Sequence, residues 1–295
     1  MKSESVEKNW KQTGRKGTGH FAVRMILWLG GCVLLVSGIS QTEKKPDEMM
    51  EKGETVQSVL GDGRKVNRLD TSSAESPVND FESEETKRVY LTFDDGPSIY
   101  TDEILDILDQ NGVKATFFVI GRGEEFYDAY RRIVREGHSI GLHSYTHDYQ
   151  KFYASEESFG EELTRLNDLL CELTGTRTNL FRFPGGSSNR VAPLPIETYI
   201  AYLNEHGINY YDWNALNGDA VTSGLSPEQL VRNIMHDVSK NEDSIVLMHD
   251  LKTTHATVES LQPLIDTLKQ QGYEILPIDA NTPLIQHVSC NSLEE

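Results

Sequence analysis

Cysteine is scarce in this chain of 295 residues, which contains only Cys32, Cys171 and Cys290. They form no Cys-x-x-Cys pair, so a thiolate zinc site is excluded, and they are too few and too scattered for a disulfide framework. A bridge between Cys171 and Cys290 stays open for a protein outside the cell, because sequence separation says nothing about geometry. The fold must therefore depend on a hydrophobic core, for which 37% hydrophobic and 8% aromatic residues are sufficient.

Positive charge is also in short supply. The chain has 28 lysines and arginines against 46 acidic residues, which gives a formal net charge of -18 at pH 7. Binding to nucleic-acid backbones requires clustered lysine and arginine side chains that neutralise phosphates. No nucleic-acid partner is therefore expected.

One long apolar run is present, at residues 25–39, and it contains no charged residue. It follows a basic segment that includes Lys2, Lys8, Lys11, Arg15, Lys16 and Arg24. This is the pattern of a signal sequence with its positive side in the cytoplasm. The run is shorter than the roughly 20 residues of a spanning helix, but residues 21–23 extend it if Arg24 reaches the headgroups. We expect residues 1–40 to be a membrane anchor, with a signal cleaved near Gly38 and Ser40 as the alternative.

Composition divides the rest of the chain into three parts. Residues 41–86 are rich in polar and charged residues and poor in aromatics, so they cannot bury enough surface to offset the entropy of ordering, and we predict a disordered tether. Residues 87–282 have the pattern of a folded domain, and residues 283–295 form a C-terminal tail. The chain is expected to be membrane-anchored and extracytoplasmic, or secreted if the signal is cleaved, and to be a monomer.

Strand and helix patterns alternate through the predicted domain. Short apolar runs typical of buried strands lie at 89–93, 115–120, 139–142, 180–183, 208–213, 245–248 and 274–278. Helical periodicity is found at 101–110, 124–136, 156–173, 195–205, 227–239 and 258–271. This alternation indicates a parallel α/β fold. Seven strands with six intervening helices favour a distorted seven-stranded (β/α) barrel, similar to a TIM barrel, over a three-layer open sheet.

Polar residues follow the ends of several predicted strands. In chain order they are Asp94, Asp95, His143, His147, Arg182, Asp219 and His249. The carboxyl ends of parallel barrel strands meet at one rim, where barrel enzymes build their active sites. We therefore expect these side chains to converge.

The first of these residues have the chemistry of a metal site. Asp94 and Asp95 are adjacent at a strand end, and because side chains alternate along a strand they can take different roles; a solvated turn is the alternative. His143 and His147 are spaced by four, which predicts that both lie on the same side of a helical turn. Two imidazoles and one carboxylate suit zinc and leave coordination positions open for water and substrate. No glutamate follows His143, so the HExxH signature of zinc proteases is absent.

Arg182 and His249 are candidates for the remaining chemistry. A buried guanidinium can hold a carboxylate and fix its orientation, although Arg182 could equally be a surface residue at a tight turn. His249 ends a buried strand, and imidazole is the side chain whose ordinary pKa best suits proton transfer near neutrality. A core histidine with satisfied hydrogen bonds is the alternative for His249.

Five segments, in the order TFDDGP, HSYTH, FRFPGG, YYDWNALNGDA and VLMHD, resemble the five motifs of the polysaccharide deacetylase family, carbohydrate esterase family 4. The resemblance covers residues 88–278. It implies a distorted seven-stranded barrel, a divalent metal such as zinc or cobalt, and removal of N-acetyl groups from a glycan polymer such as peptidoglycan or chitin. An O-acetyl esterase on acetylated polysaccharide and an inactive glycan-binding barrel are the alternatives.

The resemblance also assigns roles to individual residues. It implies that Asp95, His143 and His147 hold the metal, that Asp94 is the general base, and that Arg182 orients Asp94. It further implies that His249 is the general acid, assisted by Asp219 or, alternatively, by Asp212. The residues that it implies for substrate binding are Tyr145, Thr146, Gly185, Trp213 and Leu247, with the backbone N–H near Gly185 holding the oxyanion.

The chain departs from the family pattern at three positions. Phe183 replaces a proline and Gly185 replaces an aromatic residue in the third segment, which alters a wall of the groove. Ala220 stands where a tryptophan commonly follows the aspartate of the fourth segment, which opens the floor of the pocket. No departure affects a proposed metal ligand or proton carrier, so the departures concern the substrate.

Overall fold

The computed structural model describes residues 86–222 and 224–289. The predicted anchor at residues 1–40, nearly all of the predicted tether and Cys290 lie outside the described residues. Cys171 is described and is a free cysteine. Within the two described ranges, no helix combines the length and the apolar character needed to cross a membrane.

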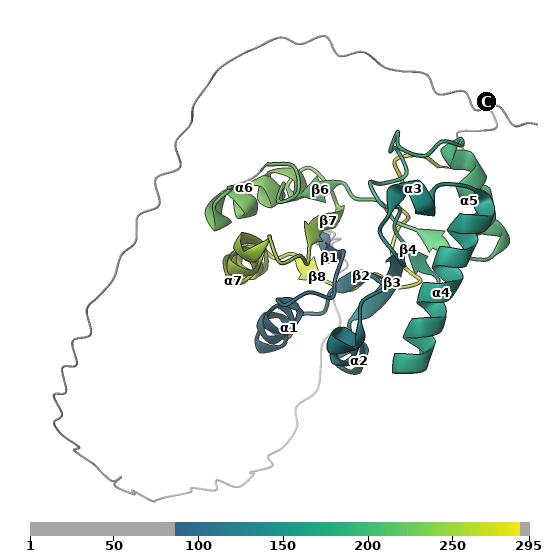
Figure 1. Cartoon of the computed structure of the whole chain (residues 1–295). Coiled ribbons are helices and arrows are strands. Elements are labelled where there is room, and N and C mark those ends of the chain that lie inside the picture. Colours follow the sequence, from purple (N-terminus) through teal and green to yellow (C-terminus); the bar gives the residue numbers. More distant parts are fainter. Residues whose placement is uncertain (1–85, 223, 290–295) are drawn as a thin grey trace, which may run out of the picture. The chain divides into compact units, whose positions relative to one another are not determined.

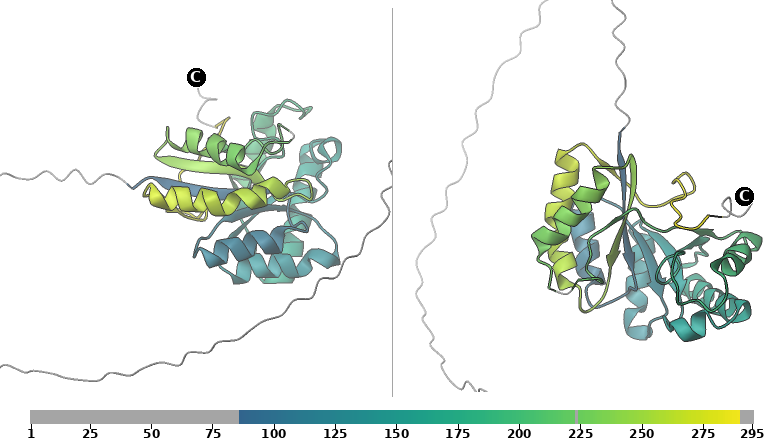
Figure 2. Two further views of the ribbon diagram at one scale, coloured as in Figure 1. Left: turned by 90° about the vertical axis from the view of Figure 1, so that its left-hand side faces the viewer. Right: turned by 90° about the horizontal axis from the view of Figure 1, so that it is seen from above.

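Parallel strands alternate with helices along the described chain. The strands are β1 (Arg88–Asp94), β2 (Thr116–Ile120), β3 (Ser139–Ser144), β4 (Leu180–Phe181), β5 (Asn209–Tyr210), β6 (Ala215–Leu216), β7 (Asp243–His249) and β8 (Glu274–Ile275). The helices are α1 (Thr101–Gln110), the 3-10 helix η1 (Glu124–Phe126), α2 (Tyr127–Arg135), α3 (Tyr149–Phe152), α4 (Glu156–Thr174), α5 (Ile196–Glu205), α6 (Pro227–Val238) and α7 (His255–Gln270). The helices lie outside the curled sheet (Figures 1 and 2).

The strands form one parallel sheet in the order β5-β4-β3-β2-β1-β7-β6. β1 pairs with β7 along its whole length, from Arg88 opposite Asp243 to Asp94 opposite His249. Its other edge is shared, because β8 pairs with the first two residues of β1 and β2 pairs with the last three. β1 is buried from Val89 onward, as expected for a parallel strand covered on both faces.

Local signals in the sequence explain where helices begin and end. α6 begins with a capping box, in which the Ser226 side chain accepts from the Gln229 N–H and the Gln229 side chain accepts from the Ser226 N–H. Pro227 occupies the first helical position, where its missing N–H is harmless. α4 ends at Thr174 and is capped by Gly175, whose φ of 74° is readily adopted by glycine.

The predicted parallel barrel is confirmed, and every predicted strand and helix has a counterpart in the structure. Two short elements were not predicted, α3 and β6. The predicted strand at 208–213 is regular only at Asn209–Tyr210, because the chain then leaves β4. The Asn214 N–H bonds to the carbonyl of Ile245 instead, and β6 pairs with β7. Residues 211–214 therefore link the two edges of the sheet, and a stretch of chain replaces the strand ladder that would close the barrel.

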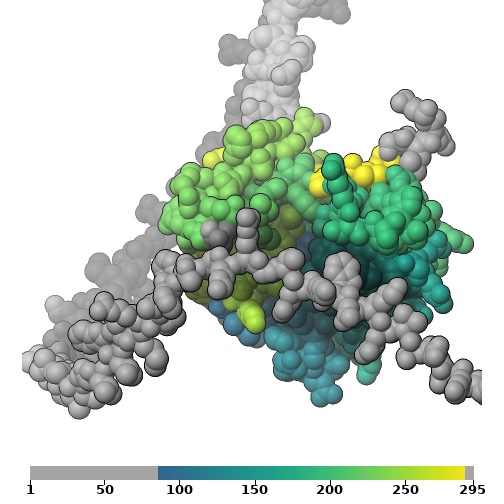
Figure 3. All heavy atoms as spheres, turned by 45° about the horizontal axis from the view of Figure 1, so that its top comes forward, coloured from purple at the N-terminus to yellow at the C-terminus, as the bar shows by residue number. Residues whose placement is uncertain are grey.

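The segment at 285–288, which the sequence assigns to a tail, makes specific contacts with the barrel. The His287 N–H donates to Asp212 Oδ2 over 2.8 Å, and the Val288 N–H donates to Ser187 Oγ over 3.0 Å. The ring of His287 meets the ring of Trp213 edge-on at 4.9 Å. Figure 3 shows these yellow residues against the green and teal surface. The segment therefore connects the loops that follow β4 and β5.

Candidate active site

Three predicted metal ligands come together at the rim of the barrel. Asp95 follows β1, His143 lies in β3 and His147 lies just beyond it, and one ligand atom from each lies within 4.8 Å of the others. Asp95 Oδ1 is 2.9 Å from His147 Nε2 and 3.4 Å from His143 Nε2. Ligands about 2.0–2.1 Å from a tetrahedral zinc ion would be about 3.3 Å apart. The spacing of the donors therefore fits a single divalent ion.

The protonation of these groups also suits a metal. His143 Nδ1 lies 2.8 Å from the carbonyl oxygen of Arg182, and because a carbonyl can only accept, Nδ1 carries the hydrogen and Nε2 presents a lone pair. Burial lowers the pKa of His143, which favours the neutral ring. Burial opposes ionisation of Asp95, but the rings of His147 and His143 hold the pKa of this carboxyl well below its usual range. Asp95 Oδ1 is buried and has no hydrogen-bond partner, as expected for a metal ligand.

The backbone at two of these ligands is unusual. Asp95 has φ of 72° and His147 has φ of 54°, and they are the only non-glycine residues with positive φ in the described part of the chain. Such conformations cost about 1–3 kcal/mol and occur mainly where function requires them. Arg122 donates to the carbonyl oxygen of Asp95 over 3.0 Å, and the His147 N–H donates to Ser144 Oγ over 3.0 Å. These bonds hold both ligands in place.

The prediction that both imidazoles lie on a helical turn is wrong. His143 belongs to strand β3 and His147 belongs to the turn that follows it. Their rings stack with centroids 5.4 Å apart and planes at 26°. The left-handed backbone at His147 turns the chain back after β3. This turn brings the ring of His147 onto the ring of His143, as the spacing of four residues would do in a helix.

Arg182 is fully buried and holds Asp94. Its Nη1 donates to Asp94 Oδ1 over 2.8 Å and to Thr92 Oγ1 over 2.6 Å. Its Nε and Nη2 donate to the carbonyl oxygens of Tyr211 and Asp212. The alternative of a surface arginine is therefore wrong, and the guanidinium fixes the orientation of the Asp94 carboxylate.

His249 forms a charged pair with Asp219. Its Nδ1 donates to Asp219 Oδ1 over 2.7 Å, which leaves Nε2 to carry an exchangeable proton. Asp219 Oδ2 accepts from the His249 N–H and from Thr257 Oγ1. Burial opposes protonation of His249, but the hydrogen bond and charge of Asp219 outweigh it and raise the pKa of His249 to about 9. His249 is therefore predominantly an imidazolium at neutral pH.

The structure places Asp219, and not Asp212, against His249. Asp212 is fully buried and accepts from the N–H and the hydroxyl of Ser187 and from the N–H of His287. Its role is to connect segments of chain. The alternative partner considered from the sequence is therefore wrong.

The predicted substrate-binding residues divide into two groups. Leu247 is half-buried, like His249, and lies two residues before it on the same face of β7. Trp213 lies against Gly186, where an added methyl group would approach its ring to 2.9 Å. Tyr145 and Thr146 instead contact α4: Arg165 stacks on the Tyr145 ring at 3.7 Å, and Thr146 Oγ1 donates to Glu162.

Two residues at the rim were not singled out from the sequence. Asp250 is buried and accepts hydrogen bonds from Ser98 and Thr101, both over 2.5 Å, so it anchors the loop that follows Asp95. Its position directly after His249 was the available signal. Tyr149, two residues after His147, meets the His147 ring edge-on at 5.4 Å. Burial, followed by the charges of Asp95 and Asp94, raises the pKa of Tyr149.

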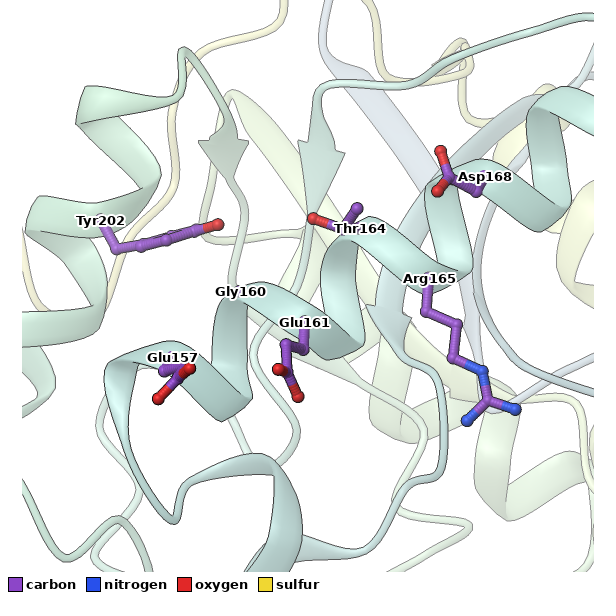
Figure 4. A pocket seen from close by; sticks show the side chains of 7 residues that line it. All are labelled: Glu157, Gly160, Glu161, Thr164, Arg165, Asp168 and Tyr202. Atoms are coloured by element: carbon purple, nitrogen blue, oxygen red, sulfur yellow. The ribbon is translucent and has the colours of Figure 1, made fainter.

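One hollow borders the His249–Asp219 pair, and another lies elsewhere in the domain. One of about 470 Å³ is lined by Asp219, Ala220 and Leu251, so the small side chain at 220 does face open space. The other, of about 650 Å³, is lined mainly by residues of α4, and Tyr202 of α5 points toward Gly160 beside it (Figure 4). None of the predicted catalytic residues or metal ligands lines the second hollow.

Comparison with known proteins agrees with this geometry. Residues 82–211 match the polysaccharide deacetylase family. The chain is 32% identical over 239 residues to a peptidoglycan-N-acetylglucosamine deacetylase of Bacillus cereus, covering 79% of this chain and 83% of that protein. The catalytic domain of a peptidoglycan N-acetylglucosamine deacetylase from Eubacterium rectale is 35% identical with a TM-score of 0.66, covering 69% of this chain and 93% of that one. The polysaccharide deacetylase Bc1974 from Bacillus cereus is 31% identical with a TM-score of 0.61, covering 68% and 96%. This chain therefore belongs to the polysaccharide deacetylase family.

Proposed function

We propose that this chain is a metal-dependent N-deacetylase that acts on N-acetylglucosamine units of peptidoglycan. The observation that carries the proposal is the position of Asp94 and His249, which are register partners at the ends of adjacent strands. A base and an acid are thereby set beside one three-residue metal site. Two of the relatives described above are named for this substrate.

The chemistry follows from the donors present. A divalent ion held by Asp95, His143 and His147, with zinc the first candidate and cobalt the second, would supply an acidified water and polarise the amide carbonyl. Asp94, held by Arg182, accepts the proton of the attacking water. The backbone N–H at Gly185 would stabilise the negative charge on the carbonyl oxygen.

His249 completes the reaction from the neighbouring strand. An amine is a poor leaving group until it is protonated, so hydrolysis of an amide requires an acid as well as a base. The imidazolium of His249, stabilised by Asp219, can donate the proton from Nε2. The products are acetate and a sugar with a free amine.

The N-terminal sequence supports the choice of a wall glycan. A basic segment followed by an apolar run at 25–39 would keep the catalytic domain outside the cytoplasm and near the membrane. The polar residues 41–86 would let the catalytic domain contact glycan at some distance from the membrane. Chitin-like polymers and acetylated xylan are the competing substrates.

Acetate release tests the proposal directly. The full chain, purified in detergent, is incubated with peptidoglycan, chitin oligomers and acetylxylan while its metal content is determined. Acetate together with new free amines on peptidoglycan is the expected result. Acetate from acetylxylan alone, without new amines, would indicate an O-acetyl esterase. No acetate from any glycan by the metal-loaded protein would indicate an inactive glycan-binding barrel.

A further inference from the structure

Tyr149 is placed by its surroundings at the edge of the metal site. It begins α3, and the Asp148 side chain accepts from the backbone N–H groups of Gln150 and Lys151, which fixes the start of this short helix. The half-buried ring of Tyr149 meets the ring of His147 edge-on, with centroids 5.4 Å apart and planes at 77°. The phenol is therefore held beside a proposed metal ligand.

On its other side, Tyr149 borders Gly185. Gly185 has φ of 80°, and a methyl group added there would lie 3.5 Å from both Cε1 and Oη of Tyr149. The same methyl group would lie 3.3 Å from Asn189 Cβ, so Asn189 and the phenol together border the space beside Gly185. The phenol comes from a different loop and lies next to the glycine.

The loop that carries Gly185 is fixed by hydrogen bonds on both sides. Tyr153 Oη donates to the carbonyl oxygen of Pro184 over 2.8 Å, and the Gly186 N–H donates to the carbonyl oxygen of Phe183 over 2.8 Å. Yet neither the N–H of Gly185 nor the hydroxyl of Tyr149 has a hydrogen-bond partner among residues 86–222 and 224–289. Two neighbouring donors therefore have no protein acceptor.

We propose that the Tyr149 hydroxyl is a second donor to the acetyl carbonyl oxygen, beside the Gly185 N–H; this inference rests on the proposed deacetylase function. A phenol with an ordinary pKa of about 10 is protonated at neutral pH and can donate. The carbonyl oxygen gains negative charge only as water attacks, so a donor at that position stabilises the transition state more than the bound substrate. The tyrosine contacts the reacting oxygen and is in this sense a catalytic residue.

Tyr149→Phe in the full chain removes the hydroxyl and keeps the ring that contacts His147. Removal of one oxyanion donor lowers kcat by about 10²–10³ in closed sites, and because Tyr149 is only half-buried we expect a decrease of about 10-fold to 100-fold. KM should change by less than about twofold, since the bond forms in the transition state. Metal content should equal that of the wild type. Tyr273→Phe, which removes a phenol hydroxyl just before β8 at the opposite end of the barrel, is the matched control and should leave kcat unchanged.

A second measurement does not depend on turnover. A phosphonamidate of glucosamine, in which tetrahedral phosphorus replaces the acetyl carbon, places an anionic oxygen where the oxyanion forms. Its affinity, measured by calorimetry, should fall in Tyr149→Phe by about the same factor as kcat, while the affinity for an intact chitin oligomer should not change.

Three results would overturn the proposal: an unchanged kcat, a rise in KM alone, or a loss of metal that accounts for the lost activity. In each case a wild-type chain that releases acetate shows that the deacetylase function itself stands. A wild-type chain that deacetylates no glycan would remove both proposals.

Discussion

Replacing Asp219 by asparagine removes one negative charge while keeping the shape of the side chain that bonds to His249. With Asp219 present, the pKa of His249 is about 9, so the imidazolium exceeds the neutral ring by about 100 to 1 at pH 7. Burial lowers the pKa of His249, and without the charge of Asp219 only the more distant Asp94 and Asp95 counteract this effect. We therefore expect the pKa of His249 to be at or below about 6.5. This fall corresponds to about 3 kcal/mol in the stability of the imidazolium.

The loss of activity should depend on pH. At pH 8 about nine-tenths of His249 is protonated with a pKa near 9, but only about 3% with a pKa near 6.5, so the rate should fall about 30-fold. The alkaline limb of the kcat profile should move from near pH 9 to pH 6.5 or below. The assay is acetate release at saturating metal between pH 5 and pH 10.

Asp212→Asn is the control, because Asp212 contacts Ser187 and His287 instead of His249. It should reduce stability and leave the alkaline limb in place. If Asp219→Asn kept a limb near pH 9, or if Asp212→Asn displaced it, our assignment of the acid pair would be refuted.

The same pair makes stability depend on pH. Because folding raises the pKa of His249, its contribution to the free energy of unfolding is complete below the unfolded value of about 6.5 and is lost as the pH rises through about 9. Folding lowers the pKa of Asp219, despite its burial, because of its bonds to His249. That contribution is lost as the pH falls below the unfolded value of about 3.9.

The remaining predictions concern the ligands, the base and the arginine. Asp95→Asn should weaken metal binding and recover activity partly in a metal titration, whereas Asp94→Asn should keep the metal and lose about 10²–10⁴ in rate that added metal does not restore; the reverse pattern of rescue would exchange their roles. His147→Ala should lose metal and activity together, and His249→Ala should lose turnover alone, as checked by elemental analysis beside acetate release; equal loss of metal from both would contradict the division. Arg182→Met should lower the free energy of unfolding by about 3–5 kcal/mol in urea denaturation, because Asp94 would be left as a buried charge without its partner; a decrease below about 1 kcal/mol would be inconsistent with this.

The sequence predicts the long elements well and the short ones poorly, for a physical reason. β1 and β7 have seven residues each and contain the mainly apolar runs 89–93 and 245–248, which are long enough for composition to identify them. β6 has only two residues, and its position depends on the bond from the Asn214 N–H to β7. Nothing local in the sequence encodes that bond.

The candidate site shows the same division. The residue types of the metal site and their positions near the ends of strands could be predicted, because parallel strands end at one rim. The turn at His147 could not, since the spacing of four is also that of a helix. The choice of Asp219 over Asp212 and the approach of Tyr149 to Gly185 depend on where separate loops meet in space. Contacts between separate loops leave no periodic pattern in the sequence from which they could be predicted.

The position of β1 implies an order in which the amide hydrogens of the domain exchange with solvent. β1 is bonded along one edge to β7 and along the other to β8 and β2, so the amides of residues 89–94 should exchange with solvent only when the whole domain unfolds. β4 and β5 have two residues each and lie at one edge of the sheet, so their backbone hydrogen bonds should open far more often. The carboxylates of Asp94 and Asp95 are therefore attached to the slowest-exchanging part of the sheet.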